Sequence, residues 1–544
     1  MPGSNKVGPT DADRAEPHRR SQRRISICIA LLIGCVIGLA IALAFVLTIF
    51  KANDGDVRGP CGAASSESSA STAAAFPPRV ADVFDPFTQA ELDQIAAHVR
   101  TNLGLMDEEP ANLTGNWLYA IDFLPRTKTD ALAHIDDSAA FTGRQAKAIV
   151  YRMADASPAV VEYRVGPIAS FPIVSGTVPV VALNQHGTLG AVSNIPHKMR
   201  PVSPMEYEAM EPLVVAAMTE LANLSMVSYG ELYDAGNMFW TDTAPRGYDR
   251  ATRQTWIWFV WYMEGMFALP LGVQMLIDHS SLDAATWTIM EIEYNGQGPF
   301  NSAAELAAAF DSGSLDAYIN YTRPVITDWE NSPLWSSMRR RGPTRPLETL
   351  PTPTVVPQGG KRYSVQGNQV QWLDWDLHVG YSTVIGVSLN DIRFRAQRIV
   401  YELSLQDAYA AYSGNTLLQS LSQYSDGGWG MGKSNFKLML GVDCPIFATL
   451  LPTSFFADGE SCTNEGSICI WEQPEDVAVM RHYDQNFFEG GFNFAASYHR
   501  SILVVRTSST VRHPVRVASA CVYARVCVSR DGRVHVCAGF HWIG

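Results

Sequence analysis

Residues 361–403 read KRYSVQGNQVQWLDWDLHVGYSTVIGVSLNDIRFRAQRIVYEL. Apolar and polar side chains alternate through most of this stretch, and turn-forming residues interrupt it every few positions. This combination predicts short antiparallel strands that form a β-sandwich. The expected strands are Arg362–Gln366, Val370–Trp372, Trp375–Val379, Gly386–Leu389, Ile392–Phe394 and Arg398–Leu403.

A glycine-rich segment follows these strands and reads Tyr424-Ser-Asp-Gly-Gly-Trp-Gly-Met-Gly-Lys433. Its one carboxylate, Asp426, lies among glycines, which let a backbone turn tightly and approach another group closely. An aspartate flanked by Tyr424 and Trp429 suits a general base in a pocket with aromatic walls. The spacing on its own favours a simpler structure, an Asp-Gly hairpin turn.

The sequence before the sandwich predicts two small domains, each with a helix packed on an antiparallel sheet. The first helix begins after Thr88, where Glu91 three residues later completes a capping box. Three strands are expected to follow it, at Trp117–Phe123, Ala146–Met153 and Ala159–Val165.

The second small domain repeats this order. It is expected to contain a helix at about Pro204–Ala222, strands at Asn237–Thr241, Trp256–Tyr262, Leu269–Leu276 and Trp287–Tyr294, and a helix at Ser302–Phe310. The aromatic strand Trp256–Tyr262 could be mistaken for a cofactor-binding segment. Large residues at strand spacing are more typical of a sheet packed on both faces, so we assign this strand to the core.

The N-terminus predicts a membrane anchor. Residues 1–24 are polar and basic, and Ile25–Phe50 then continues for 26 residues without a charge. A bilayer is crossed by a helix of roughly 20 apolar residues, and the core of a signal peptide is shorter than this run. Because arginines precede the run, the rest of the chain should face the exterior or a lumen, as in a single-pass type II membrane protein.

Other features agree with a location outside the cytoplasm. The sequons at Asn112, Asn223 and Asn320 are potential glycan sites. Cys61 lies in the stem that follows the apolar run, where an interchain disulfide could form. The formal net charge of −13 argues against nucleic acid as a partner and is compatible with attracting cationic small molecules.

Several motifs, taken in order along the chain, resemble the copper amine oxidases, and in particular their membrane-bound, vascular-adhesion-type primary-amine oxidases. The resemblance covers about residues 80–511. It is carried by Thr243-Ala-Pro-Arg-Gly247, Trp287-Thr-Ile289, Arg398-Ile-Val-Tyr-Glu402, the Asp426 loop, Asp443-Cys-Pro445, Cys469-Ile-Trp-Glu-Gln473, Arg481-His482 and Leu503–Val511.

The resemblance implies a role for each matching residue. Asp426 would be the base that removes a proton from the substrate, and Tyr424 and Trp429 would line the substrate channel. Cys444 and Cys469 would form a disulfide, which leaves Cys462 as an extra thiol. The family's cofactors are copper and trihydroxyphenylalanine quinone, with calcium as a further metal. The implied partners are a primary amine, oxygen and a second copy of the chain in a homodimer.

The sequence departs from the family pattern after Val511. The family continues with Asn-Tyr-Asp/Glu, and this tyrosine is oxidised in place to the quinone. Here the chain reads Arg512-His513-Pro514, and proline cannot become a quinone. The family's copper-binding histidines and calcium ligands would follow Gly544. We therefore expect this chain to lack the quinone and the copper ligands, and residues 512–544 to be an atypical, non-native extension.

This tail does contain side chains of the kinds that bind metals. They are Cys521, Cys527, His535, Cys537 and His541. Their types suit zinc or copper, but their spacing matches no metal-binding pattern, which favours unrelated residues over a metal site.

The expected fold is α+β, with two small helix-and-sheet domains before an incomplete antiparallel sandwich. The predicted segments are a cytoplasmic tail (1–24), a transmembrane helix (25–50), a stem (51–80), two small domains (81–168 and 169–325), a linker (326–358), the sandwich (359–511) and the tail (512–544). Oxidative deamination of primary amines is the function implied for the family. The alternative is a catalytically silent ectodomain that acts in adhesion or as a dimer partner.

Overall fold

The computed structural model of the chain describes residues 83–316 and 355–541 with internal gaps, the longest at 184–194, 412–422 and 510–520. The predicted cytoplasmic tail, transmembrane segment and stem lie outside the described residues, as does most of the predicted linker. Among the described residues, no helix is both long enough and apolar enough to cross a bilayer.

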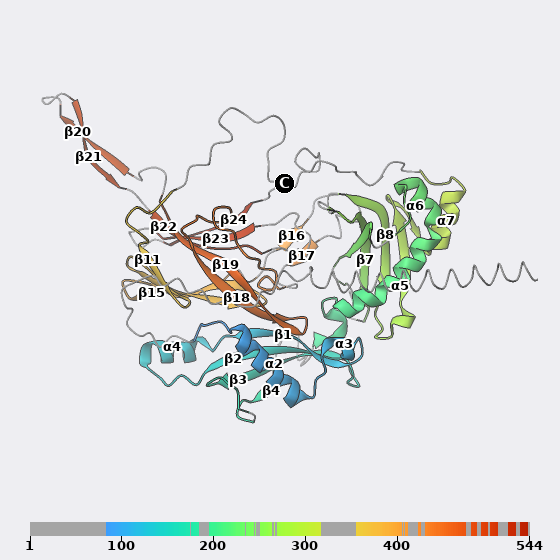
Figure 1. Ribbon diagram of the computed structural model, residues 1–544, viewed down its shortest axis with the longest axis horizontal. Coiled ribbons are helices and arrows are strands. Elements are labelled where there is room, and N and C mark those ends of the chain that lie inside the picture. Colours follow the sequence, from blue (N-terminus) through green and yellow to red (C-terminus); the bar gives the residue numbers. More distant parts are fainter. Residues whose placement is uncertain are drawn as a thin grey trace, which may run out of the picture. The chain divides into compact units, whose positions relative to one another are not determined.

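The first helix, α2 (Gln89–Leu103), forms as its sequence predicts. Thr88 and Glu91 make both hydrogen bonds of the capping box, and Gly104 ends the helix in the left-handed conformation. The helix crosses one face of a sheet that contains β1 (Asn116–Leu124), β2 (Arg144–Arg152) and β3 (Ala159–Ile168) (Figure 1). The apolar side of the helix packs on the small and branched side chains of that face. Leu92, Ile95 and Val99 of the helix contact a group of buried sheet residues, Leu118, Ile121, Ala148 and Val150.

This sheet extends beyond the first predicted domain on both sides. The short strands β4 (Val180–Ala182) and β5 (Ile195–Pro196) pair with β3, so the sheet continues past the predicted boundary at residue 168. On the other side, β1 pairs with β18 (Thr449–Ala457), followed by β19 (Glu460–Pro474) and β22 (Ser501–Thr507). Strands from both ends of the described chain therefore share one antiparallel sheet.

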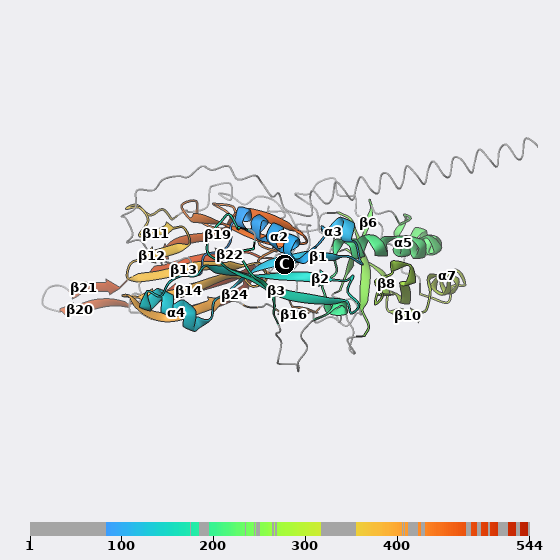
Figure 2. The same ribbon diagram turned by 90° about the horizontal axis from the view of Figure 1, so that it is seen from below.

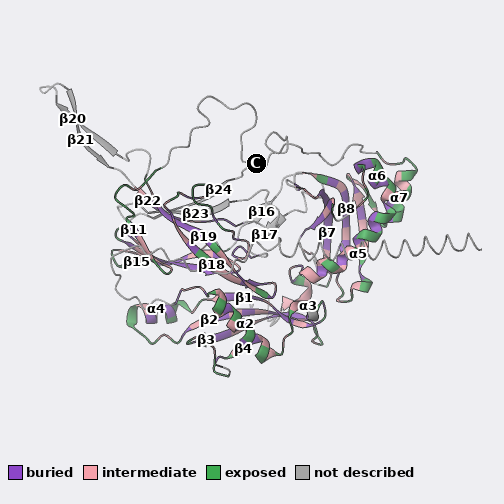
Figure 3. Ribbon diagram, viewed as in Figure 1, coloured by how far each residue is buried: buried purple, intermediate pink, exposed green. Residues whose placement is uncertain are grey.

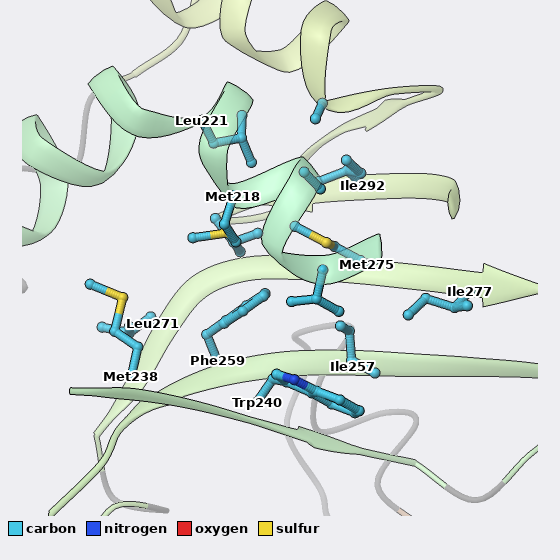
Figure 4. Close-up of a cluster of buried hydrophobic side chains, with 14 of the residues drawn as sticks. Met218, Leu221, Met238, Trp240, Ile257, Phe259, Leu271, Met275, Ile277 and Ile292 are labelled. Carbon is cyan, nitrogen blue, oxygen red and sulfur yellow. The ribbon is translucent and has the colours of Figure 1, made fainter. Parts of the chain in front are cut away.

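The second sheet contains five antiparallel strands in the order β10-β9-β8-β7-β6. Their bounds are β6 Met238–Asp242, β7 Gln254–Trp261, β8 Pro270–Asp278, β9 Thr288–Tyr294 and β10 Gln297–Phe300. Three helices accompany them, α5 (Pro204–Glu220), α6 (Ala222–Tyr229) and α7 (Ala303–Asp311). Figure 4 shows Met218 and Leu221 of the helical layer facing Phe259, Met275 and Ile292 of the sheet, all within one buried cluster.

The aromatic strand β7 is packed on both faces, as predicted. Its alternate residues Ile257, Phe259 and Trp261 belong to the cluster beneath the helices. Trp258 and Val260 belong to a separate cluster on the opposite face. The burial colouring of Figure 3 marks β7 and β8 as largely buried. Trp258 and Trp261 are therefore core residues.

The predicted sandwich is also present. Its first sheet has the order β11-β12-β13-β14-β15, and these strands lie side by side in Figure 2. The bounds are β11 Tyr363–Gln366, β12 Gln369–Trp372, β13 Trp375–Ser382, β14 Gly386–Phe394 and β15 Gln397–Ser404. Trp372, Leu377 and Ile392 of this sheet are buried with Ile470 of β19 and Val505 of β22. The two predicted strands at 386–389 and 392–394 are one continuous strand, β14.

The remaining described elements are short. They are helices α3 (Glu108–Ala111) and α4 (Lys128–Asp137) and the hairpins β16–β17, β20–β21 (Met480–Asn486 and Gly491–Tyr498) and β23–β24. Helix α4 has no counterpart among the predicted elements. It is tied to the sandwich because Asp136 accepts hydrogen bonds from Arg398 at 2.7 and 2.9 Å. These contacts, with Arg393, hold the pKa of Asp136 at about 2.

A buried ion cluster connects the loop before α5 with the second sheet. Glu206 is fully buried and accepts hydrogen bonds from Arg200 at 2.8 Å and from Arg253 at 2.9 and 3.1 Å. His279 lies 3.3 Å from the same carboxylate. Burial alone would raise the pKa of Glu206, but Arg253 and Arg200 more than offset this and hold it below its usual value. The carboxylate therefore stays ionised between two buried guanidiniums.

We predict that Glu206→Ala lowers the free energy of unfolding by about 3–5 kcal/mol, because it leaves two buried guanidiniums without their counter-charge. Urea unfolding followed by tryptophan fluorescence measures the change. Glu220→Ala, an exposed residue at the end of the same helix, is the matched control and should change stability by about 0.5 kcal/mol or less. Equal stabilities of the two variants would contradict the prediction.

Candidate active-site loop

The structure describes the two sides of the predicted catalytic loop. Tyr424 lies on β17 (Gln423–Ser425) and pairs through its backbone with Ala410 of β16 (Tyr409–Ala411). Asp426 and Trp429 fall within 426–429, which is outside the described residues, and Pro514 also lies outside them. The predicted roles of these residues therefore remain predictions, and the structure defines the frame around them.

Two glycines after the loop lie against a turn formed by residues 382–384. Gly430 has a φ of +85°, a conformation that side-chain-bearing residues rarely adopt. A Cβ atom on Gly432 would lie only 2.0 Å from the carbonyl oxygen of Ser382. Such a distance is far inside van der Waals contact, so these positions need glycine because two backbones touch there.

Backbone hydrogen bonds fix this contact. The N–H of Met431 donates to the carbonyl of Val384 at 2.7 Å, and the N–H of Lys433 donates to the carbonyl of Thr383 at 3.0 Å. In return, the carbonyl of Gly432 accepts a hydrogen bond from the hydroxyl of Tyr381 at 2.5 Å. The segment that follows Asp426 is therefore held along its backbone by the end of β13 and the turn after it.

The 382–384 turn is itself held by Asp122 of β1. Oδ1 of Asp122 accepts hydrogen bonds from the Ser382 hydroxyl at 2.7 Å and from the Thr383 N–H at 2.8 Å. The side chain is buried, with 6% of its surface exposed. Burial raises the pKa of Asp122, although the nearby Lys147 ammonium and the hydrogen bonds act in the opposite direction. The aspartate is a buried anchor that crosses from the first sheet to the sandwich.

Asn435 connects the loop to the strand that leads towards Pro514. Its Oδ1 accepts hydrogen bonds from the hydroxyls of Thr507, at 3.1 Å, and Ser509. The Ser509 hydroxyl also lies 2.8 Å from the carbonyl of Met431. Asn435 and Ser509 form an isolated antiparallel bridge as well. The segment after the predicted base and the segment before the expected quinone position thus meet at one buried junction.

The implied disulfide is present. Cys444 and Cys469 are bonded, with their Cα atoms 6.5 Å apart, and both are buried. The bond joins the loop that follows Asp443 to the middle of β19, beside Leu438, Trp471 and Ile502. The expectation that Cys462 is an extra thiol is wrong, because Cys462 is disulfide-bonded as well.

The predicted tail forms a hairpin of β23 (Cys521–Val528) and β24 (Val534–His541). The register places Cys527 opposite His535 and Cys521 opposite His541. Over the part of the chain that the structure describes, no group of three or more His, Cys, Asp or Glu side chains is arranged to hold a metal ion.

The arrangement of sheets matches known structures. A lysyl oxidase of Pichia pastoris superposes with a TM-score of 0.73 at 23% identity, covering 86% of this chain and 61% of its own. An Aspergillus nidulans amine oxidase gives a TM-score of 0.70 at 22% identity, covering 85% and 59%. These TM-scores show a shared fold.

The sequence comparisons decide the family. Residues 364–513 match the enzyme domain of the copper amine oxidases. The chain is a member of the copper amine oxidase family. It is 32% identical to the copper-containing diamine oxidase of Mus musculus over 421 residues, and 30% identical to that of Homo sapiens over 446 residues. These alignments cover 76% and 80% of this chain but 54% and 58% of the relatives, so the chain spans little more than half of their length.

Two residues that hold the segments around the loop, Asp122 and Asn435, were not among the predicted site residues. The sequence does contain a signal for Asp122, because a carboxylate in the apolar strand Trp117–Phe123 needs a buried partner. The sequence contains no such signal for Asn435, because its partners lie about 70 residues further along the chain.

We predict that Asp122 makes the protein less stable as the pH rises from about 4 to 7. A folded-state pKa above the unfolded one means that the folded state binds the proton more tightly. The stability from this group is then present below the unfolded pKa and is lost as the pH rises through the folded pKa. Urea unfolding at pH 4.5 and pH 7 should show the stability of the unsubstituted protein falling relative to Asp122→Asn.

Two further variants control this measurement. Asp137→Asn changes an exposed carboxylate and should change the stability by about 0.5 kcal/mol or less. Asp122→Ala should lose about 1–3 kcal/mol for each buried donor left unsatisfied, at both pH values. A stability of the unsubstituted protein that rises with pH relative to Asp122→Asn would contradict the raised pKa of Asp122.

Proposed function

We propose that this chain has the scaffold of a copper- and quinone-dependent primary-amine oxidase but does not itself catalyse the reaction. The family reaction would convert a primary amine, oxygen and water into an aldehyde, ammonia and hydrogen peroxide. The observation that carries the proposal is the sequence Arg512-His513-Pro514, which follows Val511 where the family has Asn-Tyr-Asp/Glu and contains no tyrosine. None of these three side chains has a phenol to oxidise.

We therefore derive no reaction step for this chain. In this proposal Asp426 is the position of the substrate base, Tyr424 and Trp429 flank the amine channel, and the frame around them is retained without the cofactor. In this proposal the chain acts as a catalytically silent ectodomain.

We predict that the purified chain, supplied with Cu²⁺, produces no hydrogen peroxide from benzylamine or putrescine above the no-enzyme rate. It should also show no quinone adduct with phenylhydrazine. The bovine liver primary amine oxidase, run in parallel, is the positive control. Amine-dependent peroxide formation that Asp426→Asn abolishes would overturn the proposal, because it would require a working cofactor.

We further propose that the chain is a single-pass type II membrane glycoprotein that forms a homodimer, with residues 25–50 as anchor. The buried Cys444–Cys469 disulfide supports an oxidising compartment. Asn112 and Asn223 are both exposed, and Nδ2 of Asn223 donates a hydrogen bond to Asp311 at 2.6 Å. Asn320 lies outside the described residues.

In mammalian cells, an intact-cell protease should cleave the chain and glycosidase treatment should reduce its apparent mass. Asn112→Gln should remove part of that mass shift. Two results together would contradict this location. The chain would resist protease both at the cell surface and inside opened secretory vesicles, and glycosidase would leave its apparent mass unchanged.

A further inference from the structure

Helices α5 and α6 carry apolar side chains on their exposed side as well as on their buried one. Residues three or four positions apart are neighbours on the surface of a helix. The Ser225 N–H donates to the carbonyl of Leu221 at 2.9 Å, so this spacing continues across the junction of the two helices. Figure 3 marks exposed segments on both helices. We define the α5–α6 stripe as the exposed residues at this spacing: Val215, Thr219, Asn223, Met226 and Val227.

Three members of the stripe are large apolar side chains. Val215, Met226 and Val227 are 42%, 48% and 44% exposed. Single exposed apolar residues are common on proteins, whereas neighbouring ones mark a surface that another group covers. Asn223 lies within the stripe, three and four positions before Met226 and Val227. A group attached to Asn223 would therefore lie over both of these side chains.

Asn223 has the chemistry for such an attachment. It begins the sequon Asn223-Leu224-Ser225, in which the side-chain amide accepts a sugar. An asparagine amide has two N–H groups, and one of those of Asn223 donates to Asp311 at 2.6 Å. Attachment of a sugar replaces only one of the two hydrogens. The hydrogen bond to Asp311 is therefore compatible with a glycan on the same nitrogen.

The hydroxyl of Ser225 gives independent support. Ser225 is 0% exposed, and its Oγ has no hydrogen-bond partner in the described part of the chain. A buried hydroxyl without a partner destabilises the folded state, and an alanine would avoid that cost. The hydroxyl has a use before folding, because a sequon requires Ser or Thr at its third position. The folded domain thus retains a side chain that serves the unfolded chain.

We propose that Asn223 carries an N-linked glycan, added before the domain folds, that covers the α5–α6 stripe. The inference rests on the proposed location of this domain in a secretory lumen. Nδ2 of Asn223 attacks the anomeric carbon of an oligosaccharide carried on a lipid pyrophosphate. The new C–N bond replaces the bond from that carbon to the pyrophosphate oxygen, the lipid pyrophosphate leaves, and the amide nitrogen loses one proton. The attached glycan then shields Met226 and Val227.

Glycosidase digestion of the full chain from mammalian cells tests the attachment. Asn223→Gln should reduce the mass shift by one glycan. Ser225→Ala should reduce it equally, because the sequon loses its hydroxyl while Asn223 is kept. Asn102→Gln, which changes an exposed asparagine outside any sequon, is the matched control and should leave the shift unchanged.

The outcomes separate this inference from the proposed function. A mass shift that Asn223→Gln leaves unchanged would overturn the glycan at Asn223, while the chain would remain a glycoprotein. The absence of any mass shift in the unsubstituted chain would overturn both.

Oxidation by tert-butyl hydroperoxide, followed by peptide mass spectrometry, tests the cover. Met226 and Met290 of β9 are both 48% exposed in the polypeptide, so without a glycan they should oxidise at similar rates. With the glycan, Met226 should oxidise more slowly than Met290, and Asn223→Gln should remove the difference. Asn112→Gln, which changes a sequon elsewhere, should leave it unchanged. An oxidation rate of Met226 that is the same in the unsubstituted chain and in Asn223→Gln would overturn the shielding role.

Discussion

The frame of the candidate active site depends on the buried carboxylate of Asp122. It lies on β1, in the first sheet, yet it accepts hydrogen bonds from Ser382 and Thr383 of the sandwich. The turn that it holds contacts Gly430 and Gly432 so closely that no side chain fits between the two backbones. A polar group buried in this way is stable only when its partners are in place, so the anchor also enforces the alignment of two distant segments.

Continuous strand pairing supports the same alignment. Because β1 pairs with β18, the sheet beneath α2 and the sheet that closes the sandwich are one structure. The Cys444–Cys469 disulfide then attaches the end of the loop region to β19. A helix-and-sheet domain that the sequence suggests is separate is thus joined by backbone hydrogen bonds to the enzyme-like domain. The position of the loop is set by both.

Local patterns predicted the local structure well. The Thr88–Glu91 capping box, the aromatic strand β7 and the strands after residue 361 are specified by neighbouring residues, so their spacing could be interpreted. The shared sheet, the anchor Asp122 and the junction at Asn435 depend on partners far away in the chain, which periodicity does not encode. The disulfide could be inferred only because the family pattern supplied its pairing.

We infer that the segment after Asp426 and the strand leading towards Pro514 form one structural unit through Asn435 and Ser509. A double-mutant cycle with Asn435→Ala and Ser509→Ala, measured by urea unfolding, tests it most directly. Residues in direct contact show interaction energies of about 0.5–3 kcal/mol, and we predict a coupling of about 1 kcal/mol. Additive effects, within about 0.3 kcal/mol, would contradict the claim, because they would mean that the two segments are stabilised independently.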